Sequence, residues 1–278
     1  MTSAPVITRL PIKEREPFLH LRYGAIDVQD NALVLNDAKG TRMQIPVGAL
    51  ACLMLEPGTT VTHAAVKLCA EEDCLLVWCG EAGVRFYAAG QPGGARADKL
   101  LFQLGLASDP KRRLAVVREM FRRRFGDDVP DRRSVDQLRG LEGANVKRQY
   151  ETIAAKYGVT WEGRRYDPAQ WSKATPINRA ISSANACLYG VTEAAILVAG
   201  YSPAVGFLHT GKPLSFVYDV ADLYKFDLSV PVAFEVVAEG KHSDVEGAVR
   251  RKLRDLFKKE RIMARLIPDI EGVLDVGG

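Results

Sequence analysis

The sequence has few residues of the kind that build disulfide frameworks or zinc ribbons. Its 278 residues include five cysteines, an odd number, and no two of them are spaced CxxC. A disulfide-stabilised secreted domain and a zinc ribbon are therefore poor descriptions, and we expect the cysteines to be small buried apolar residues. The one local group, with Cys69, Cys74 and Cys79 downstream of His63, matches no standard metal-ligand spacing.

The N-terminus lacks an apolar run of the kind that directs export. Its first residues, MTSAPVITRLPIKERE, carry charges where a signal peptide needs an apolar stretch. The most membrane-like segment, 194–208, is uncharged but contains Pro203 and two glycines, and it is shorter than the ~20 residues that span a bilayer. We therefore expect a cytoplasmic protein with no membrane partner, and a buried helix and its exit at 194–208.

Two common catalytic motifs are incomplete. Gly206, Gly211 and Lys212 fit the GxxxxGK pattern of a phosphate-binding loop, but Pro213 stands where that loop needs a serine or threonine for magnesium. No GxSxG nucleophile elbow is present to single out a catalytic serine. Both nucleotide hydrolysis and a serine triad are therefore disfavoured.

Little net charge is present, +4, but it is unevenly spread. Residues 111–133 hold nine basic side chains against four acidic ones, and residues 250–265 hold eight against two. Such clusters could face an acidic polymer such as nucleic acid, or each could be the solvated face of a helix. Charge alone leaves both interpretations open.

The hydrophobic period changes about a third of the way along the chain. Short alternating runs separated by Gly, Asp, Asn and Pro predict strands at 18–24, 25–29, 32–37, 42–46, 50–56, 74–80 and 84–89, with one helix at 62–72. The segment GQPGGAR within 90–98 continues neither a strand nor a helix. Beyond it, a period near 3.6 predicts helices at 99–106, 111–125, 134–157, 176–199, 215–226, 243–259 and 263–274.

We therefore predict an α+β chain. A small β-rich, β-sandwich-like N-terminal domain would occupy residues 1–89, a linker residues 90–98, and an all-α helical catalytic domain residues 99–278. No internal repeat is present, which sets solenoid folds aside.

Four residues form the strongest candidate site: Glu142, His209, Asp219 and Asp222. The i, i+3 spacing of Asp219 and Asp222 would place both carboxylates on one helix face, where they repel unless a cation or solvent lies between them. Glu142 lies in the middle of another expected helix between Gly140 and Gly143, which cost roughly 1 kcal/mol each against alanine. Those glycines could let a neighbouring helix or a DNA backbone approach closely.

Three carboxylates and one imidazole favour a hard divalent ion, Mg²⁺ or Mn²⁺, over zinc, with the histidine favouring manganese slightly. Such ions support phosphoryl transfer without a covalent protein nucleophile. The alternative is that Asp219 and Asp222 are an exposed helix face and Glu142 a surface residue. Spacing alone does not separate the two.

Several motifs then carry a family resemblance. LRGLEG around Glu142, GRRYDP around Tyr166, ACLYGVTEAAI around Tyr189 and GFLHTGKPLSFVYDVADLYKFD resemble the CRISPR adaptation integrases of subtype I-E. The similarity extends through LRYGAID, IPVGALACLMLEPGT, LVWCGEAGVR and AAGQPGGAR, so it covers nearly the whole chain in consistent order.

The resemblance implies a metal-dependent endonuclease and integrase with Glu142, His209 and Asp222 as metal ligands and Asp219 as a supporting acid. The implied reaction joins the 3′-hydroxyl ends of a short captured DNA to the CRISPR array by transesterification; with water as nucleophile, the same chemistry cleaves branched DNA. Implied partners are double-stranded and branched DNA, a second copy in a homodimer, and a small ferredoxin-like adaptation protein, which completes a heterohexamer.

The resemblance also implies supporting roles in DNA binding or around the site. Tyr23 would cap the end of the captured duplex, although an aromatic on a strand could equally pack in the β core. Polar positions near the metal would be Arg85, Tyr166, Tyr189, Lys212, Tyr218 and Lys225. A covalent role for Tyr189 is unnecessary beside a metal, and a tyrosine in an apolar helix is more often a core residue.

Two other functions stay open on the sequence. One is a non-catalytic DNA-binding scaffold, against which the intact acids and histidine speak. The other is a metal-dependent nuclease that acts on branched DNA in repair, whose active site would be identical.

Overall fold

The N-terminal strands form two four-stranded sheets with an unexpected share of parallel pairing. The computed structural model describes residues 10–11, 14–37, 39–79, 86–90, 97–126, 133–165, 174–240 and 243–276. One sheet has the order β1-β5-β7-β8, with bounds Leu19–Leu21, Cys52–Leu55, Leu75–Cys79 and Phe86–Gly90, and its first three strands are parallel. The other has the order β4-β3-β2-β6, with bounds Arg42–Ile45, Ala32–Asn36, Gly24–Gln29 and Thr59–Val61.

One sheet is buried on both of its faces. Along β5, Leu53 and Leu55 point into an apolar core shared with the second sheet and with helix α1, His63–Glu71. Cys52 and Met54 point to the opposite side, into the core of the helical part. Strand side chains alternate between faces, so this strand is apolar at every position because both faces are covered.

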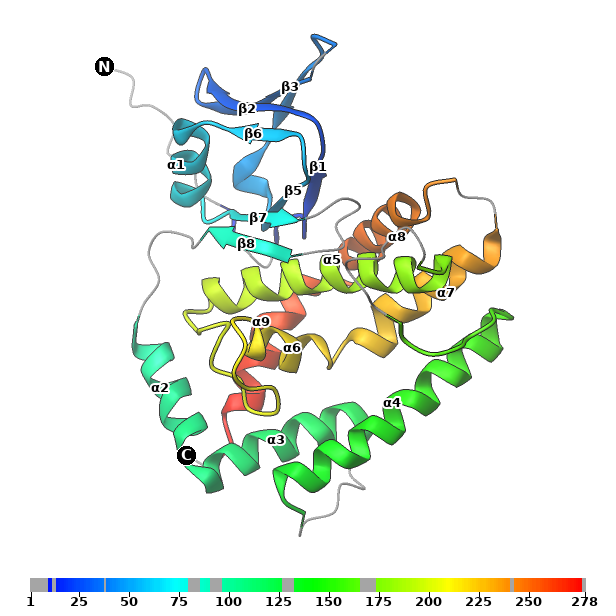
Figure 1. Ribbon diagram of the computed structural model, residues 1–278. Helices are drawn as coiled ribbons and strands as arrows, with labels where there is room; N and C mark the ends of the chain where they lie inside the picture. Colours follow the sequence, from blue (N-terminus) through cyan, green and yellow to red (C-terminus); the bar gives the residue numbers. More distant parts are fainter. Residues whose placement is uncertain are drawn as a thin grey trace.

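Helix α5, Pro176–Val198, lies directly beneath that sheet (Figure 1). A Cβ atom built on Gly190 would lie 3.6 Å from Cys52 Sγ and 3.7 Å from Met54 Sδ, which places the helix in van der Waals contact with β5. Helix α5 is long and apolar enough to cross a membrane, but 83% of its apolar window is buried inside the protein. It is therefore a core helix, against which several other helices pack.

The remaining helices form two groups: α6, α7, α8 and α9 pack against α5, and α2, α3 and α4 lie farther from it (Figure 1). Their bounds are Ala97–Ser108 (α2), Pro110–Phe125 (α3), Val135–Tyr157 (α4), Ser215–Ala221 (α6), Val230–Glu239 (α7), Val245–Lys259 (α8) and Ile262–Leu274 (α9). Local sequence sets several of the ends. Ser134 and Gln137 form a capping box at the start of α4, and Gly158 ends it in the left-handed conformation at φ 65°.

The α+β class predicted from the sequence is confirmed, with strands before helices, and all five cysteines are free and buried as expected. Two elements were not predicted, β6 and α7. Helix α7, VPVAFEVVAE, is short and rich in valine, which favours strands, and its proline lies in the first turn, where no backbone N–H is needed. The helix expected over 215–226 ends at Ala221 and is followed by a π-helical turn, Lys225–Ser229.

Candidate active site

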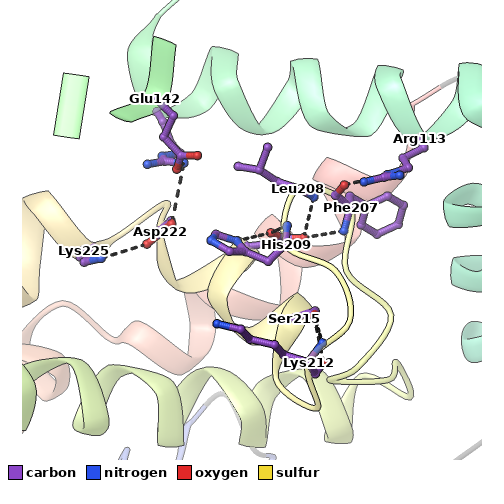
Figure 2. A network of polar contacts seen from close by, with 11 residues as sticks. Arg113, Glu142, Phe207, Leu208, His209, Lys212, Ser215, Asp222 and Lys225 are labelled. Carbon is purple, nitrogen blue, oxygen red and sulfur yellow. Dashed lines mark hydrogen bonds and ion pairs between the residues drawn. The ribbon is translucent and has the colours of Figure 1, made fainter. Parts of the chain in front are cut away.

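Three separate segments bring the candidate residues together (Figure 2). Glu142 comes from α4, His209 from the loop before α6, and Asp219 and Asp222 from α6 and its C-cap. The expectation that Asp219 and Asp222 act as one stacked pair is only partly right. Asp219 points into the loop at 207–209, whereas Asp222 faces Glu142 and Lys225.

Asp219 organises the loop that carries His209. Its Oδ2 accepts hydrogen bonds from the backbone N–H groups of Phe207 (2.6 Å) and Leu208 (3.1 Å), and its Oδ1 accepts from the backbone N–H of His209 (2.8 Å). Oδ1 also lies 2.8 Å from His209 Nδ1, and the Asp219 side chain is fully buried. Because both oxygens are saturated by the loop, Asp219 holds the site together and has no oxygen to spare for an ion.

The same contact orients the imidazole of His209. With Nδ1 donating to Asp219, the Nε2 lone pair is the free one, which is the arrangement that supporting carboxylates give to metal-binding histidines. Burial lowers the pKa of His209, but the hydrogen bond and charge of Asp219 and the charges of Asp222 and Glu142 outweigh it, and the net shift is upward. Those charges show that the imidazole lies within electrostatic range of both remaining acids.

The loop itself is anchored on several sides. Gly206 has no room for a side chain, since a Cβ atom there would lie 2.2 Å from the carbonyl oxygen of His209. Arg113 Nε on α3 donates to the Phe207 carbonyl at 2.8 Å (Figure 2). Gln103 on α2 donates to the carbonyls of Ser202 and Val205 at 3.0 and 2.7 Å.

Glu142 and Asp222 are held by basic residues. Arg124, at the end of α3, places Nη1 2.5 Å from Glu142 Oε1 and 3.9 Å from Asp222 Oδ2. Lys225 Nζ lies 3.5 Å from Asp222 Oδ1. Burial raises the pKa of Asp222, but the charges of Lys225, Arg124 and His209 outweigh it and lower the pKa overall. Both acids are therefore nearly buried and paired with cationic side chains.

The donor set fits a hard divalent ion by its chemistry, since Glu142 and Asp222 offer carboxylate oxygens and His209 offers an imidazole nitrogen. A cationic nitrogen already bridges the two acids. In the described part of the chain, no group of three or more histidine, cysteine or acidic side chains is arranged tightly enough to hold an ion. Binding there would require Arg124 to move from between the acids.

The chain matches known proteins along most of its length. The family model of "CRISPR associated protein Cas1" matches residues 19–128 and 123–253. The CRISPR-associated endonuclease Cas1 of Escherichia coli strain K12 is 58% identical over 277 residues, covering 100% of this chain and 90% of the relative.

Solved structures agree with the sequence comparison. The crystal structure of the TtCas1-DNA complex has a TM-score of 0.83 at 41% identity, covering 94% of this chain and 92% of its own. A chain of the Cas6-RT-Cas1–Cas2 complex has a TM-score of 0.71 at 15% identity, covering 99% of this chain and 36% of its own, which shows the fold alone. The chain belongs to the Cas1 family.

Membership of the Cas1 family confirms the resemblance seen in the sequence and the classification as a CRISPR-associated endonuclease. The remaining expected residues differ in position. The Tyr218 ring makes edge contacts with Tyr189 on one side and His209 on the other, with ring centroids 5.0 and 5.8 Å apart. Lys212 Nζ lies 6.0 Å from the centroid of the Tyr218 ring. Burial raises the pKa of Tyr189 to about 12, so its hydroxyl stays protonated.

Tyr23 lies between β1 and β2, apart from this cluster, and is 64% exposed with φ 56°. Its ring rests against Gly58, where a Cβ atom would lie 2.6 Å from Tyr23 Cδ1. The exposed ring contradicts the alternative of a strand aromatic packed in the β core. Arg85 and Tyr166 lie outside the described residues.

Sequence reasoning on this Cas1-family chain missed Arg124, Arg113 and Gln103. Both arginines belong to the basic run 111–133, in which nothing distinguishes them from their neighbours. The glycines beside Glu142 were misinterpreted in one respect. A Cβ atom at Gly140 or Gly143 meets no heavy atom within 4 Å in the described structure, so no neighbouring helix approaches there.

Proposed function

We propose that this chain is the metal-dependent DNA integrase of CRISPR spacer acquisition, of subtype I-E, with Mg²⁺ or Mn²⁺ held by Glu142, His209 and Asp222. The observation that carries the proposal is the Asp219 clamp, which turns the free nitrogen of His209 toward the same side as the paired acids Glu142 and Asp222. Such a clamp is unnecessary for a histidine that merely packs in a core. The relatives' shared designation as CRISPR-associated endonucleases supports the same assignment.

In the proposed reaction, a 3′-hydroxyl of the captured DNA attacks a phosphodiester of the array. A new phosphorus–oxygen bond forms, the bond to the array strand's 3′-oxygen breaks, and the proton lost by the attacking hydroxyl is balanced by one taken up by the leaving oxygen. Glu142, His209 and Asp222 would hold a divalent ion, which would supply Lewis-acid polarisation of the phosphate. Lys212 and Lys225 add positive charge beside it, while Tyr218 packs against His209 and limits the orientations of its ring.

The proposed partners follow from the same family. DNA would bind as a duplex or as a branched substrate, two copies of the chain would form a homodimer, and a small ferredoxin-like Cas2 protein would complete a heterohexamer. The 41% identical relative was solved as a complex with DNA, and the more distant one as a complex that includes Cas2. Tyr23 is proposed to stack on the end of the captured duplex, because its ring is exposed on a turn. Arg85, Tyr166 and Tyr189 are proposed to support the site.

A nuclease that acts on branched DNA in repair would use the same residues, and a scaffold would use none of them. The test offers a supercoiled plasmid with a CRISPR array, short duplex DNA, the Cas2 partner and Mg²⁺ or Mn²⁺. Covalent joining of the duplex supports integration. Nicking without joining supports the repair nuclease, and neither product supports the scaffold.

Two controls connect that test to the proposed ligands. His209→Ala should abolish joining while duplex binding stays within a few-fold, because the substitution removes a ligand and leaves the basic surface intact. His63→Ala, on the exposed first turn of α1, is the matched control and should join DNA normally. Joining that persists in EDTA would refute the metal-dependent mechanism.

A further inference from the structure

Arg124 forms ion pairs with two of the candidate metal ligands, Glu142 and Asp222. It stands in the last turn of α3, and only 4% of its side chain is exposed. The neighbouring Arg122 and Arg123 turn to Glu119 instead, with side chains 55% and 29% exposed. The run of three arginines is therefore split by tertiary structure, and one guanidinium is directed inward.

The inward guanidinium lies between the two acids. Nη1 contacts Glu142 at 2.5 Å and remains within 3.9 Å of Asp222, residues that are 14% and 11% exposed. Two carboxylates buried this close together would repel each other strongly if no cation lay between them. Arg124 thus supplies, from within the chain, the charge neutralisation that a divalent ion would otherwise supply.

The pairing with the two acids does not satisfy every N–H group of the Arg124 guanidinium. Its Nη2 is buried and has no hydrogen-bond partner among the described residues. An arginine built only to stabilise an acid normally forms a bidentate pair, whereas this one offers a single nitrogen. Its Cζ also lies 4.9 Å from the ring centroid of Phe125 and 5.9 Å from that of Phe121. The two rings provide a surface on which the guanidinium can rest without either carboxylate.

We propose that Arg124 is a resident counter-ion of the metal site. Its guanidinium bridges Glu142 and Asp222 until a divalent ion displaces it, and this competition weakens metal binding. The inference rests on the proposed function, because it takes these two acids as metal ligands. Its consequence is that metal affinity is set by a competition between two cations, one of them part of the chain.

The test measures Mn²⁺ binding to the full chain without DNA, by the electron paramagnetic resonance signal of free Mn²⁺ and by calorimetry. Arg124→Gln should bind Mn²⁺ about tenfold more tightly than the wild type, the equivalent of about 1.4 kcal/mol. Arg124→Lys, which keeps the charge but not the reach, should fall between them. Arg122→Gln is the matched control and should leave the affinity unchanged, since Arg122 pairs with Glu119 on the exposed side.

Thermal unfolding provides a second measurement that does not depend on catalysis. Without metal, Arg124→Gln should unfold at a lower temperature than the wild type, because the acids lose their counter-ion, and saturating Mn²⁺ should raise its midpoint by more than it raises that of the wild type. Equal or weaker Mn²⁺ binding by a cooperatively folding Arg124→Gln would overturn the inference.

Failure of the proposed function would look different. In that case the wild type, Arg124→Gln and Glu142→Gln would all show the same weak background binding of Mn²⁺. If instead Glu142→Gln loses a site that the wild type has, the metal assignment holds, and the Arg124 variants then decide the inference alone.

Discussion

Replacing Asp219 with asparagine should release the loop that presents His209. In the wild type, the two carboxylate oxygens accept two hydrogen bonds each, three from backbone N–H groups and one from the imidazole. An asparagine keeps one acceptor oxygen and turns an NH₂ group toward the other two donors. Two hydrogen bonds to a charged acceptor are therefore lost in a fully buried place.

The expected cost follows from those contacts. A hydrogen bond to a charged group contributes roughly 1.5–3 kcal/mol, so the loss of two in Asp219→Asn should reduce the free energy of unfolding by about 3–6 kcal/mol. That is a large share of the roughly 5–15 kcal/mol that holds a domain folded. Asp227→Asn makes the same chemical change on an exposed residue of the next turn and should cost less than about 0.5 kcal/mol.

Hydrogen exchange locates the effect more sharply than global unfolding does. The backbone amides of Phe207, Leu208 and His209 should lose protection in Asp219→Asn, while amides in the middle of α5 change only as far as global stability falls. Unchanged protection at those three amides, with an unfolding free energy within about 1 kcal/mol of the wild type, would show that Asp219 does not organise the loop.

Four further substitutions test other parts of the fold. Burial raises the pKa of Glu193 to about 7, from 4.5; the folded protein then binds the extra proton, so stability falls as pH rises from about 4.5 to 7, and Glu193→Gln should exceed the wild type by up to about 3 kcal/mol at pH 8 but hardly at pH 5 in urea unfolding. A gain that is the same at both pH values would contradict this cause. Gly140→Ala and Gly143→Ala, where a Cβ atom meets nothing, should each stabilise the free protein by about 0.5–1 kcal/mol in thermal unfolding, and a simultaneous loss of duplex affinity would place a DNA backbone against α4. Gly206→Ala should instead destabilise, because its Cβ atom would overlap the backbone of His209.

The sequence predicted the elements whose burial has a simple pattern. Helix α4 begins at its capping box and ends at its terminal glycine, both of which are local signals in the sequence. It failed at two short elements, strand β6 and helix α7. Helix α7 is short and rich in valine, a β-branched residue that favours strands, so local propensity does not indicate a helix there. It packs against α5 and α4.

The candidate site was predictable as a set of residues but not as a set of roles. The i, i+3 spacing of Asp219 and Asp222 predicted that both acids belong to one helix, and they lie on α6 and at its C-cap. It did not indicate that one serves the loop and the other faces Glu142, because that difference depends on α6 ending at Ala221 and on a tight turn at Gly206. Both features depend on contacts between segments that spacing along a helix does not describe.

A count of the basic residues in the two runs omits the fact that some of them are already paired inside the fold. Arg113 holds the loop carbonyl, Arg124 neutralises the acid pair, and Arg250 on α8 lies buried 3.6 Å from Glu56 at the end of β5. Each of these cations is already paired within the fold and is not available to a phosphate without breaking that pair. The salt dependence of DNA binding reports only the phosphates that are newly neutralised. The slope of log binding constant against log salt concentration should therefore be well below the value expected if every basic residue of 111–133 and 250–265 met the DNA backbone. A slope that matched the full count would require the internal pairs to open on binding, and the Arg124 variants would then change DNA affinity as strongly as metal affinity.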